Sequence, residues 1–241
     1  MTNPAITVSV VSHQQNGLVN QFLDDLQRHC SGTVCLILTQ NVPDPVPFAT
    51  ATLSLPHEVI VNEQPKGYGT NHNAAFIRCR TRFFCVANPD LHLSANPFPP
   101  LLKTLENERV GVTGPLVRSP AGEIEDSARH FPTPGILLRK LLGNQPPPDY
   151  PVDRIPMEVD WIAGMFMLFR SNLYRAIKGF DEAYFLYYED VDLCRRLMQS
   201  GKSVIFNPAA EVIHDARRAS RRSLRPAFYH LSSALRYFLR S

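Results

Sequence analysis

The chain has 241 residues, of which 44% are hydrophobic and 20% are charged, and its formal net charge is +3. This balance excludes wholesale disorder and a membrane-embedded body, and the length suffices for one large α/β domain. The first residues lack the basic stretch and apolar core of a secretory signal, and the longest apolar run, 161–169, is too short to span a bilayer. We therefore expect a globular, cytoplasmic protein.

The first half of the chain alternates apolar patterns of period two with patterns of helical spacing. The predicted strands are 6–11, 34–39, 58–61 and 82–87, and the predicted helices are about 18–26 and 70–78. Such alternation favours an open α/β sheet, in which ligands bind at the carboxyl ends of the strands.

The second half is less regular, because 115–156 is rich in proline and glycine and is predicted to be a variable loop with a short helix near 136–142. The other predicted strands are 110–113, 159–170, 204–206 and 211–213, and the predicted helices are 189–200 and a basic, amphipathic one at the end of the chain. The sequence shows no internal repeat.

The cysteines argue against two kinds of stabilisation. Their number is odd and no two of them have Cys-x-x-Cys spacing, so the sequence supports neither a zinc knuckle nor a disulfide framework. We expect free thiols at Cys30, Cys35, Cys79, Cys85 and Cys194.

The turn Asn88-Pro89-Asp90 follows a predicted strand. In an extended segment Asn88 and Asp90 point to the same side, since side chains alternate, and Pro89 stiffens the backbone between them. One carboxylate with one amide suits Mg²⁺ or Mn²⁺ that also carries a diphosphate. An ordinary β-turn has the same composition, so both interpretations stay open.

Acidic and aromatic residues are interleaved from 180 to 192. Glu189 and Asp190 stand at a predicted helix start, where backbone N–H groups favour anions, and such a carboxylate can accept a proton from an alcohol. The alternative is an acidic cap over a hydrophobic staple. Asp192 and Arg196 are four residues apart and are predicted to form a helix ion pair.

Two further groups could contact an anion or a metal. His214 follows a short predicted strand and could offer a neutral ring nitrogen to the same metal, although a lone histidine is usually structural. The arginines of the terminal basic run could contact a diphosphate or could simply be solvated. They are Arg217, Arg218, Arg221 and Arg222.

The order and spacing of these motifs resemble those of the family 2 glycosyltransferases, particularly their rhamnosyltransferase-like bacterial branch. The most specific element is the acidic stretch Gly179-Phe-Asp-Glu-Ala-Tyr-Phe-Leu-Tyr-Tyr-Glu-Asp-Val-Asp-Leu-Cys-Arg-Arg196. The resemblance covers most of the chain. Its other elements are Val10-Val11-Ser12-His13, Lys66-Gly67-Tyr68-Gly69-Thr70-Asn71-His72-Asn73, Asn88-Pro89-Asp90, Trp161-Ile162-Ala163-Gly164 and Ile213-His214.

The resemblance implies a GT-A fold with a Rossmann-like mixed central sheet flanked by helices, a nucleotide diphosphate sugar donor, Mg²⁺ or Mn²⁺, and inversion at the anomeric carbon. Asp90 and His214 match metal positions, Asn88 replaces the first acid of the family's Asp-x-Asp element, Asp190 matches the catalytic base, and Glu189 is a possible helper. The positions that the resemblance places near donor or acceptor are Ser12, His13, Lys66, Gly67, Asn73, Trp161 and Gly164.

The sequence departs from the family after the second predicted strand. The family carries Val-Asp-Asn there, with the aspartate holding the nucleoside, whereas this chain has neutral Gln40 followed by Asn41. Either of these two residues could replace the missing acid, so the nucleotide stays open. The branch favours dTDP-rhamnose as donor, with a UDP-sugar as the alternative.

The expected organisation is a single GT-A domain, 1–241. Residues 1–114 would mainly bind the nucleotide sugar, 157–225 would serve the acceptor and catalysis, and 226–241 would form the basic amphipathic helix. That helix could contact the anionic inner face of the cell membrane, or it could dock on the protein's own core. The implied acceptor is a glycan or lipid-linked hydroxyl in bacterial cell-surface polysaccharide synthesis, and we expect no nucleic-acid binding.

Two rival functions remain at this point. A catalytically silent glycan- or nucleotide-binding protein of the same fold would fit the Gln40 departure. A nucleotidyltransferase would also need metal and diphosphate contacts, but it would release pyrophosphate rather than a nucleoside diphosphate.

Overall fold

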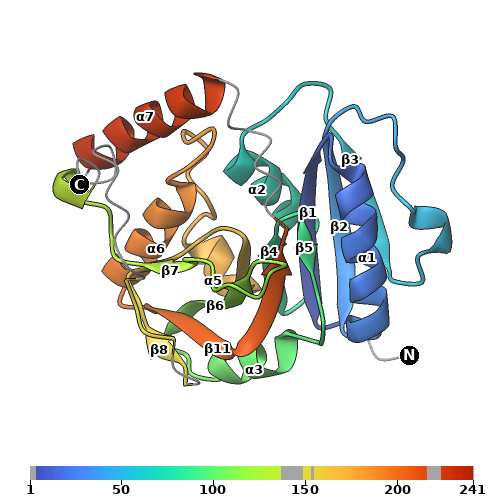
Figure 1. Ribbon diagram of the computed structural model, residues 1–241, viewed down its shortest axis with the longest axis horizontal. Helices are drawn as coiled ribbons and strands as arrows, with labels where there is room; N and C mark the ends of the chain where they lie inside the picture. The colour runs from blue at the N-terminus through green and yellow to red at the C-terminus, as the bar shows by residue number, and fades with distance from the viewer. Residues whose placement is uncertain (1–3, 137–148, 153–154, 216–223, 241) are drawn as a thin grey trace.

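The computed structural model describes residues 4–136, 149–152, 155–215 and 224–240. Within these residues, nine strands form one mixed sheet through the centre of the molecule, in the order β3-β2-β1-β4-β10-β6-β11-β5, with β8 paired to β11 (Figure 1). The sheet strands are β1 Ile6–His13, β2 Val34–Val42, β3 His57–Val61, β4 Phe83–Ala87, β5 Leu91–His92, β6 Val110–Arg118, β8 Met157–Glu158, β10 Phe166–Arg170 and β11 Ser203–His214. A second sheet pairs β7 Ala128–Arg129 with β9 Trp161–Ile162.

Helices flank the central sheet and divide its core into two layers. One apolar cluster joins the sheet to α1 and α3, through residues such as Phe22 and Phe98. The other joins it to α2, α5 and α6, through residues such as Tyr174 and Leu193. The described helices are α1 Asn16–Cys30, the 3₁₀ turn η1 Thr50–Thr52, α2 Tyr68–Arg78, α3 Phe98–Thr104, α5 Ser171–Ala176, α6 Glu189–Gln199 and α7 Leu224–Leu239.

Strand direction explains which loops meet at the functional edge of the sheet. Strands β3, β2, β1 and β4 are parallel, so the carboxyl ends of all four lie together. Strand β10 runs antiparallel to β4 and begins where β4 ends, because Phe166 pairs with Ala87. The segment just before β10 is thereby brought to the same edge.

The predicted α/β order is confirmed, but three predicted strands and the start of the predicted loop are wrong. The single strand predicted over 159–170 is two strands, β9 and β10, because the chain turns at 163–165. The two short strands predicted at 204–206 and 211–213 are one continuous strand, β11, whose register against β6 shifts between Asn207 and Glu211. Strand β6 extends through Arg118, so the irregular region begins later than 115. Most of the helix predicted near 136–142 lies outside the described residues.

Helix α7 lies at the periphery over α6 (Figure 1). Its Ala234 and Tyr237 pack in a small apolar cluster with Tyr184, Tyr188 and Val191. The docking alternative for the terminal helix is therefore confirmed for this face of α7. All five cysteines are free thiols, as predicted.

Candidate active site

The turn Asn88-Pro89-Asp90 lies at the carboxyl end of β4, as its sequence predicted. The Asn88 N–H donates to the Met165 carbonyl at 2.9 Å, which fixes the turn against the start of β10. The Asp90 carbonyl accepts from the Asp215 N–H at 2.9 Å, so the turn is also joined to the end of β11. Three segments distant in sequence therefore converge at this turn.

His214 lies between two carboxylates, those of Asp90 and Glu125. Its Nε2 atom is 3.3 Å from Asp90 Oδ1, and its Nδ1 atom is 2.7 Å from Glu125 Oε2. Burial disfavours the charged imidazole, but the two carboxylates outweigh it and raise the pKa of His214 to about 9. The structure thus brings Asp90 and His214 together and adds an acid that the sequence did not indicate.

The donor set at this turn fits a divalent cation that is shared with a diphosphate. Asp90 Oδ1 is buried and, within the described residues, accepts no hydrogen bond of good geometry; it faces the His214 ring as an ionic partner at 3.3 Å. In the same part of the chain no group of three or more His, Cys, Asp or Glu side chains is arranged as a complete metal site. Asp90 and His214 would therefore hold such an ion only together with ligands from a bound substrate.

Tyr68 connects this turn to the acidic residues of α6. Its hydroxyl donates to the Gly164 carbonyl at 2.6 Å and lies 3.3 Å from Asn88 Oδ1. Burial raises the pKa of this phenol well above its ordinary value, and the nearby charges of Glu189, Asp190 and Asp90 raise it further. The phenol therefore keeps its proton and lies within the electrostatic influence of all three carboxyl groups.

Asp190 is held by backbone N–H groups at the start of α6. Its Oδ2 accepts from the Gly164 N–H and its Oδ1 from the Val191 N–H, each at 2.9 Å. Burial raises the pKa of Asp190, although these two hydrogen bonds partly oppose the rise. Asp190 is half-buried as a residue, and a carboxylate whose pKa is raised is suited to accept a proton.

Glu189 is almost fully buried, with 5% of its surface exposed, and its Oε2 atom accepts no hydrogen bond within the described residues. Burial raises its pKa well above the usual range, and the adjacent Asp190 raises it further. Glu189 therefore favours its neutral form in this site.

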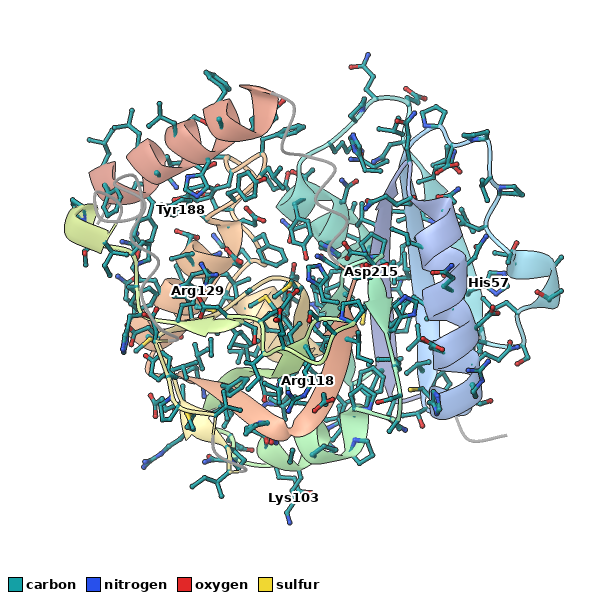
Figure 2. The ribbon with its side chains drawn as sticks, viewed as in Figure 1. His57, Lys103, Arg118, Arg129, Tyr188 and Asp215 are labelled. Carbon is teal, nitrogen blue, oxygen red and sulfur yellow. The ribbon has the colours of Figure 1, made fainter. Side chains whose placement is uncertain are left out.

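The backbone enters α6 in a costly conformation. Tyr187 and Tyr188 both have φ of +69°. This is the left-handed region of backbone conformation, which residues other than glycine and asparagine rarely adopt. Tyr188 lies under α7 (Figure 2), where its ring contacts Tyr237 at a centroid distance of 5.5 Å. Such strain persists only where the surroundings enforce it, and it is common at functional sites.

The acidic segment, defined here as residues 179–190, approaches the Lys66–Gly69 turn closely. The Tyr68 N–H donates to the Phe185 carbonyl at 2.9 Å. A Cβ atom at Gly67 would lie 2.8 Å from the same carbonyl oxygen, and one at Gly69 would lie 2.6 Å from Phe180 Cβ. Both glycines are therefore required for this contact.

A buried amide network fixes the opposite side of that turn. Asn41 accepts from the Lys66 N–H and from Asn62 Nδ2, both at 2.8 Å, and it donates to the Lys66 carbonyl at 2.9 Å. Asn62 Nδ2 also lies 2.7 Å from Asn71 Oδ1. Asn41 therefore uses its amide inside the protein, as a support for the Lys66 turn.

The remaining predicted residues on this side occupy different environments. Ser12 is fully buried, and its Oγ accepts from the Gln15 N–H at 3.0 Å at the start of α1. His13 is exposed, with Nδ1 at 3.2 Å from Asn41 Nδ2, and Lys66 is also exposed. The structure brings His13, Asn41 and Lys66 together and directs the Ser12 hydroxyl to the backbone.

The Asn73 side chain lies on the acidic segment rather than among the other predicted donor residues. Its Nδ2 donates to the Phe180 carbonyl at 2.9 Å, and its Oδ1 accepts from the Phe180 N–H at 3.0 Å and from Tyr174 at 2.9 Å. These bonds leave its amide occupied with structural contacts. Its predicted donor contact stays a prediction.

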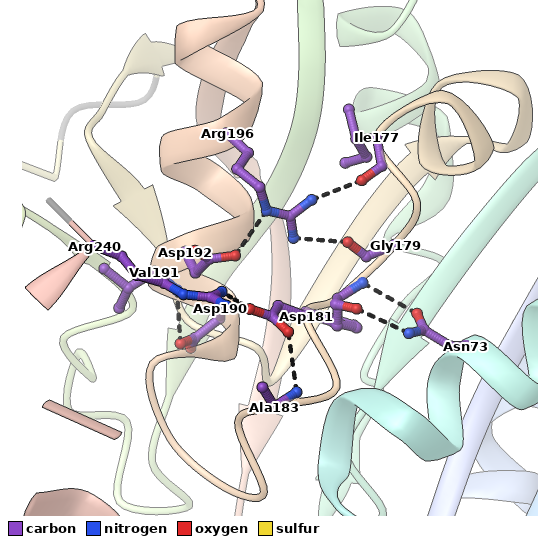
Figure 3. Close-up of polar contacts among 11 residues, drawn as sticks. Asn73, Ile177, Gly179, Asp181, Ala183, Asp190, Val191, Asp192, Arg196 and Arg240 are labelled. Carbon is purple, nitrogen blue, oxygen red and sulfur yellow. Dashed lines mark hydrogen bonds and ion pairs between the residues drawn. The ribbon is translucent and has the colours of Figure 1, made fainter. Parts of the chain in front are cut away.

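The predicted ion pair between Asp192 and Arg196 is confirmed, at 2.7 Å (Figure 3). Arg196 also donates to the carbonyls of Ile177 and Gly179, each at 2.7 Å. The pair therefore fastens the start of the acidic segment to α6.

Trp161 lies on β9 beside the cluster that contains Tyr184 and Tyr188. Its indole N–H donates to the His130 carbonyl at 2.9 Å, and the Arg129 guanidinium lies 5.6 Å from its ring centroid (Figure 2 labels Arg129). Trp161 and Gly164 are three residues apart, and Gly164 contacts Asp190 directly. The basic run that includes Arg217 and Arg222 lies outside the described residues.

Sequence reasoning missed Tyr68, Glu125 and Asn62 as members of this edge. Asn62 directly follows β3, so the rule that ligands bind at carboxyl ends of strands could have indicated it. Tyr68 stands between two glycines that were noted only as a turn. Glu125 carried no local signal, because it reaches His214 through a bend that follows β6.

The comparisons with curated proteins give two informative relatives, whereas no family model matches the chain. The chain is 32% identical over 186 residues to the rhamnosyltransferase WbbL of Escherichia coli strain K12, in a match that covers 72% of this chain and 70% of WbbL. It is 37% identical over 142 residues to the N-acetylglucosaminyl-diphospho-decaprenol L-rhamnosyltransferase of Mycobacterium tuberculosis. That match covers 54% of this chain and less than half, 45%, of the mycobacterial protein.

Solved structures of low sequence identity share the fold. GalNAc-T7 with UDP, GalNAc and Mn²⁺ superposes with a TM-score of 0.70 at 14% identity, covering 88% of this chain and 43% of that one. The mannosyltransferase PcManGT from Pyrobaculum calidifontis, in complex with GDP-Man and Mn²⁺, has a TM-score of 0.66 at 14% identity and covers 100% of this chain and 66% of its own.

The sheet order and these superpositions define a protein of the GT-A class, as the sequence predicted. The chain belongs to the family 2 glycosyltransferases, in their rhamnosyltransferase-like branch. It is a glycosyltransferase.

Proposed function

We propose that this glycosyltransferase moves rhamnose from a nucleotide diphosphate donor to a hydroxyl of a glycan or lipid-linked acceptor, with inversion, in cell-surface polysaccharide synthesis. The observation that carries the proposal is the placement of Asp190 on Gly164, which Tyr68 ties to the Asn88–Asp90 turn. Both relatives described above are named as rhamnosyltransferases, which favours dTDP-rhamnose over a UDP-sugar.

In the proposed reaction, the oxygen of the acceptor hydroxyl attacks the anomeric carbon of the sugar. Asp190 accepts the proton that this hydroxyl loses. The bond from that carbon to the diphosphate oxygen breaks, and the nucleoside diphosphate leaves with the electron pair. The raised pKa of Asp190 makes it a stronger base than an exposed aspartate. The raised pKa of Glu189 disfavours a second negative charge beside that base.

Asp90 and His214 are the residues that would hold Mg²⁺ or Mn²⁺, in keeping with the buried Asp90 oxygen that faces the histidine at 3.3 Å. The ion would supply positive charge that stabilises the departing diphosphate. His214 must lose its proton to act as a ligand, since an imidazolium has no free lone pair. Glu125 then remains hydrogen-bonded to the other ring nitrogen and orients the ring.

The nucleoside would lie along the ends of β1 and β2, and residues 1–114 would mainly serve the donor, with 157–225 serving acceptor and catalysis. Asn41 has its amide occupied by the Lys66 turn. Gln40 is partly exposed at the same strand end, so we assign to Gln40 the contact that the family makes through an aspartate. Lys66 and His13 are exposed near it and can approach the diphosphate or ribose.

The acceptor class sets the place of action. The mycobacterial relative is named for a decaprenol-linked acceptor, so a similar acceptor would bring this enzyme to the inner face of the cell membrane. Within the described residues, no helix has both the length and the apolar character needed to cross a bilayer. Contact with the membrane would therefore be peripheral where these residues are concerned.

The test is a product assay with dTDP-rhamnose, UDP-sugars and GDP-mannose, offered with glycan and polyprenyl-diphosphate acceptors in Mg²⁺ or Mn²⁺. The expected result is a rhamnosylated acceptor of inverted anomeric configuration and a free nucleoside diphosphate. The Asp90→Ala variant should lose turnover and its response to added metal, whereas Asp24→Ala, at an exposed carboxylate of α1, should match the wild type. Release of pyrophosphate, or binding with no turnover on any acceptor, would refute the proposal.

A further inference from the structure

Helix α7 has an apolar face that no other part of the described residues covers. The stripe consists of Phe228, Leu231, Leu235 and Leu239, whose exposed fractions are 69%, 71%, 60% and 77%. Their spacing of three, four and four residues places them along one side of the helix. Four large apolar side chains in one exposed row are uncommon on a monomeric protein surface and indicate an interaction site.

The opposite side of α7 is attached to the acidic segment. The Ser233 hydroxyl donates to the Leu186 carbonyl at 2.8 Å, and the Tyr229 ring stacks on Phe185 at a centroid distance of 4.7 Å. Arg240 forms an ion pair with Asp181 (Figure 3). The helix therefore holds the segment at its start, its middle and its approach to α6.

The part of the segment that α7 holds includes the strained backbone at Tyr187 and Tyr188, directly before Glu189 and Asp190. Left-handed backbone at two successive tyrosines has to be enforced by neighbouring contacts. His230 of α7 supplies such contacts, with ring centroids 5.3 Å from Tyr187 and 5.4 Å from Tyr188. Anything that fixes α7 in place therefore also stabilises the geometry of the candidate base.

The charge of the sequence around α7 indicates which kind of surface the apolar stripe binds. From 216 to 241 the sequence contains seven arginines and no aspartate or glutamate. An apolar stripe within such an arginine-rich, acid-free sequence is the composition of a helix that lies in an anionic membrane interface. Self-association would bring together two chains with the same excess of arginine, which opposes it.

We propose that the outer stripe of α7 docks on an anionic lipid bilayer, and that docking stabilises residues 181–190 through the inner face of the same helix. This docking surface would make the peripheral membrane contact of the proposed function, and it adds an effect of that contact on the site. This proposal rests on that proposed location but not on the identity of the sugar.

The experiment uses the full chain without any sugar donor, with vesicles of phosphatidylglycerol and phosphatidylcholine or of phosphatidylcholine alone. Cosedimentation measures binding, and hydrogen–deuterium exchange measures the protection of amides 183–190. The wild type should bind the anionic vesicles preferentially, with exchange of these amides slowing several-fold. The Phe228→Gln/Leu231→Gln/Leu235→Gln variant should bind about tenfold or more weakly, since each side chain would lose most of its insertion energy.

Two controls separate the surface from its coupling to the site. Ile77→Gln combined with Ile155→Gln removes two apolar side chains of similar exposure, 74% and 66%, elsewhere on the molecule and should leave binding unchanged. Tyr229→Ala combined with Ser233→Ala should keep vesicle binding but lose the protection of amides 183–190.

Three results would overturn the inference. Equal vesicle binding by the wild type and the outer-face variant would show that the outer stripe is not the docking surface. Unchanged exchange in bound wild type would show that docking does not stabilise residues 181–190. A lipid-free dimer that the outer-face substitutions dissociate would assign the stripe to self-association instead. Transfer activity is not measured here, so a failed product assay with an intact vesicle response would count against the proposed reaction alone.

Discussion

The two sides of the Tyr68 turn are stabilised in opposite ways. On the donor side, Asn41 is saturated with hydrogen bonds to Lys66 and Asn62, and every one of these residues has ordinary backbone geometry. On the catalytic side, Glu189 has a buried oxygen with no hydrogen-bond partner among the described residues, and two tyrosines before it have positive φ. The amide network at the Lys66 turn is satisfied, whereas the entry to α6 retains strained backbone and an unpartnered buried oxygen.

This difference indicates where the protein gives up stability for function. A buried carboxylate without a hydrogen bond costs free energy, and so does left-handed backbone at a tyrosine. Natural proteins retain such features mainly where a site needs them. Substitutions on the donor side should therefore mainly cost stability and donor affinity, and those on the catalytic side should mainly cost rate.

The largest expected effect is that of Asp190→Asn. The amide keeps the size of the side chain but cannot accept the acceptor's proton, so kcat should fall by about 10²–10⁴-fold, the range typical of a lost general base. Steady-state transfer assays measure the change, with circular dichroism to verify folding. Asp24→Asn, at an exposed position of α1, is the matched control and should keep full activity. Near-normal turnover by folded Asp190→Asn would remove Asp190 as the base.

On the donor side, Asn41→Ala should mainly lower stability and donor affinity, whereas Asp190→Asn mainly lowers kcat. The Lys66 N–H loses its side-chain acceptor and the Lys66 carbonyl keeps only the Asn71 amide, at 3.1 Å, at a cost of about 1–3 kcal/mol in unfolding free energy. KM for the donor should rise because the turn is loosened, while kcat changes less. Urea unfolding and donor saturation curves measure both, and exposed Asn172→Ala is the control. A fall in kcat with unchanged donor KM would contradict the assigned supporting role.

Sequence alone predicted the order of strands and helices because their periodicity is local, and it located the Asn88–Asp90 turn because the turn follows a buried strand. It also predicted the pair of Asp192 and Arg196, since helical spacing fixes their proximity. It failed over 159–170, where an apolar run of uniform composition conceals the turn around Gly164. Periodicity cannot reveal a turn that tertiary contacts with Tyr68 and Asp190 impose.

The parts of the site that depend on distant contacts were also out of reach. Glu125 meets His214 across 89 positions of sequence, and Asn73 meets Phe180 across 107. Neither pairing follows from local pattern, because each depends on how separate strands and loops are placed in the sheet. Motif resemblance supplied the residues of the edge, but the hydrogen bonds of Asn41 and Asn73 distinguish supporting side chains from free ones.

Tyr68→Phe tests the junction between the two sides. The Gly164 carbonyl loses its donor, and kcat should fall about tenfold, as expected for one buried hydrogen bond. A specific readout is the pH dependence of kcat/KM. If Gly164 moves, its N–H bond to Asp190 weakens, the pKa of that carboxyl rises further, and the rising limb of the profile shifts to higher pH. A fall in rate with an unshifted profile would limit Tyr68 to a general packing role.

The smallest expected effect is that of Glu189→Gln. It is also the most direct measure of the free-energy cost of burying the Glu189 carboxyl group. Because the folded-state pKa of Glu189 is raised above its unfolded value, the stability that this residue contributes is fully present below about pH 4.3 and is lost as the pH rises toward the folded pKa. The glutamine variant lacks this loss. Its Tm should match the wild type near pH 4 and exceed it at pH 7–8, by about 2–4 °C for each kcal/mol relieved. A Tm difference independent of pH would mean that Glu189 carries no buried charge cost.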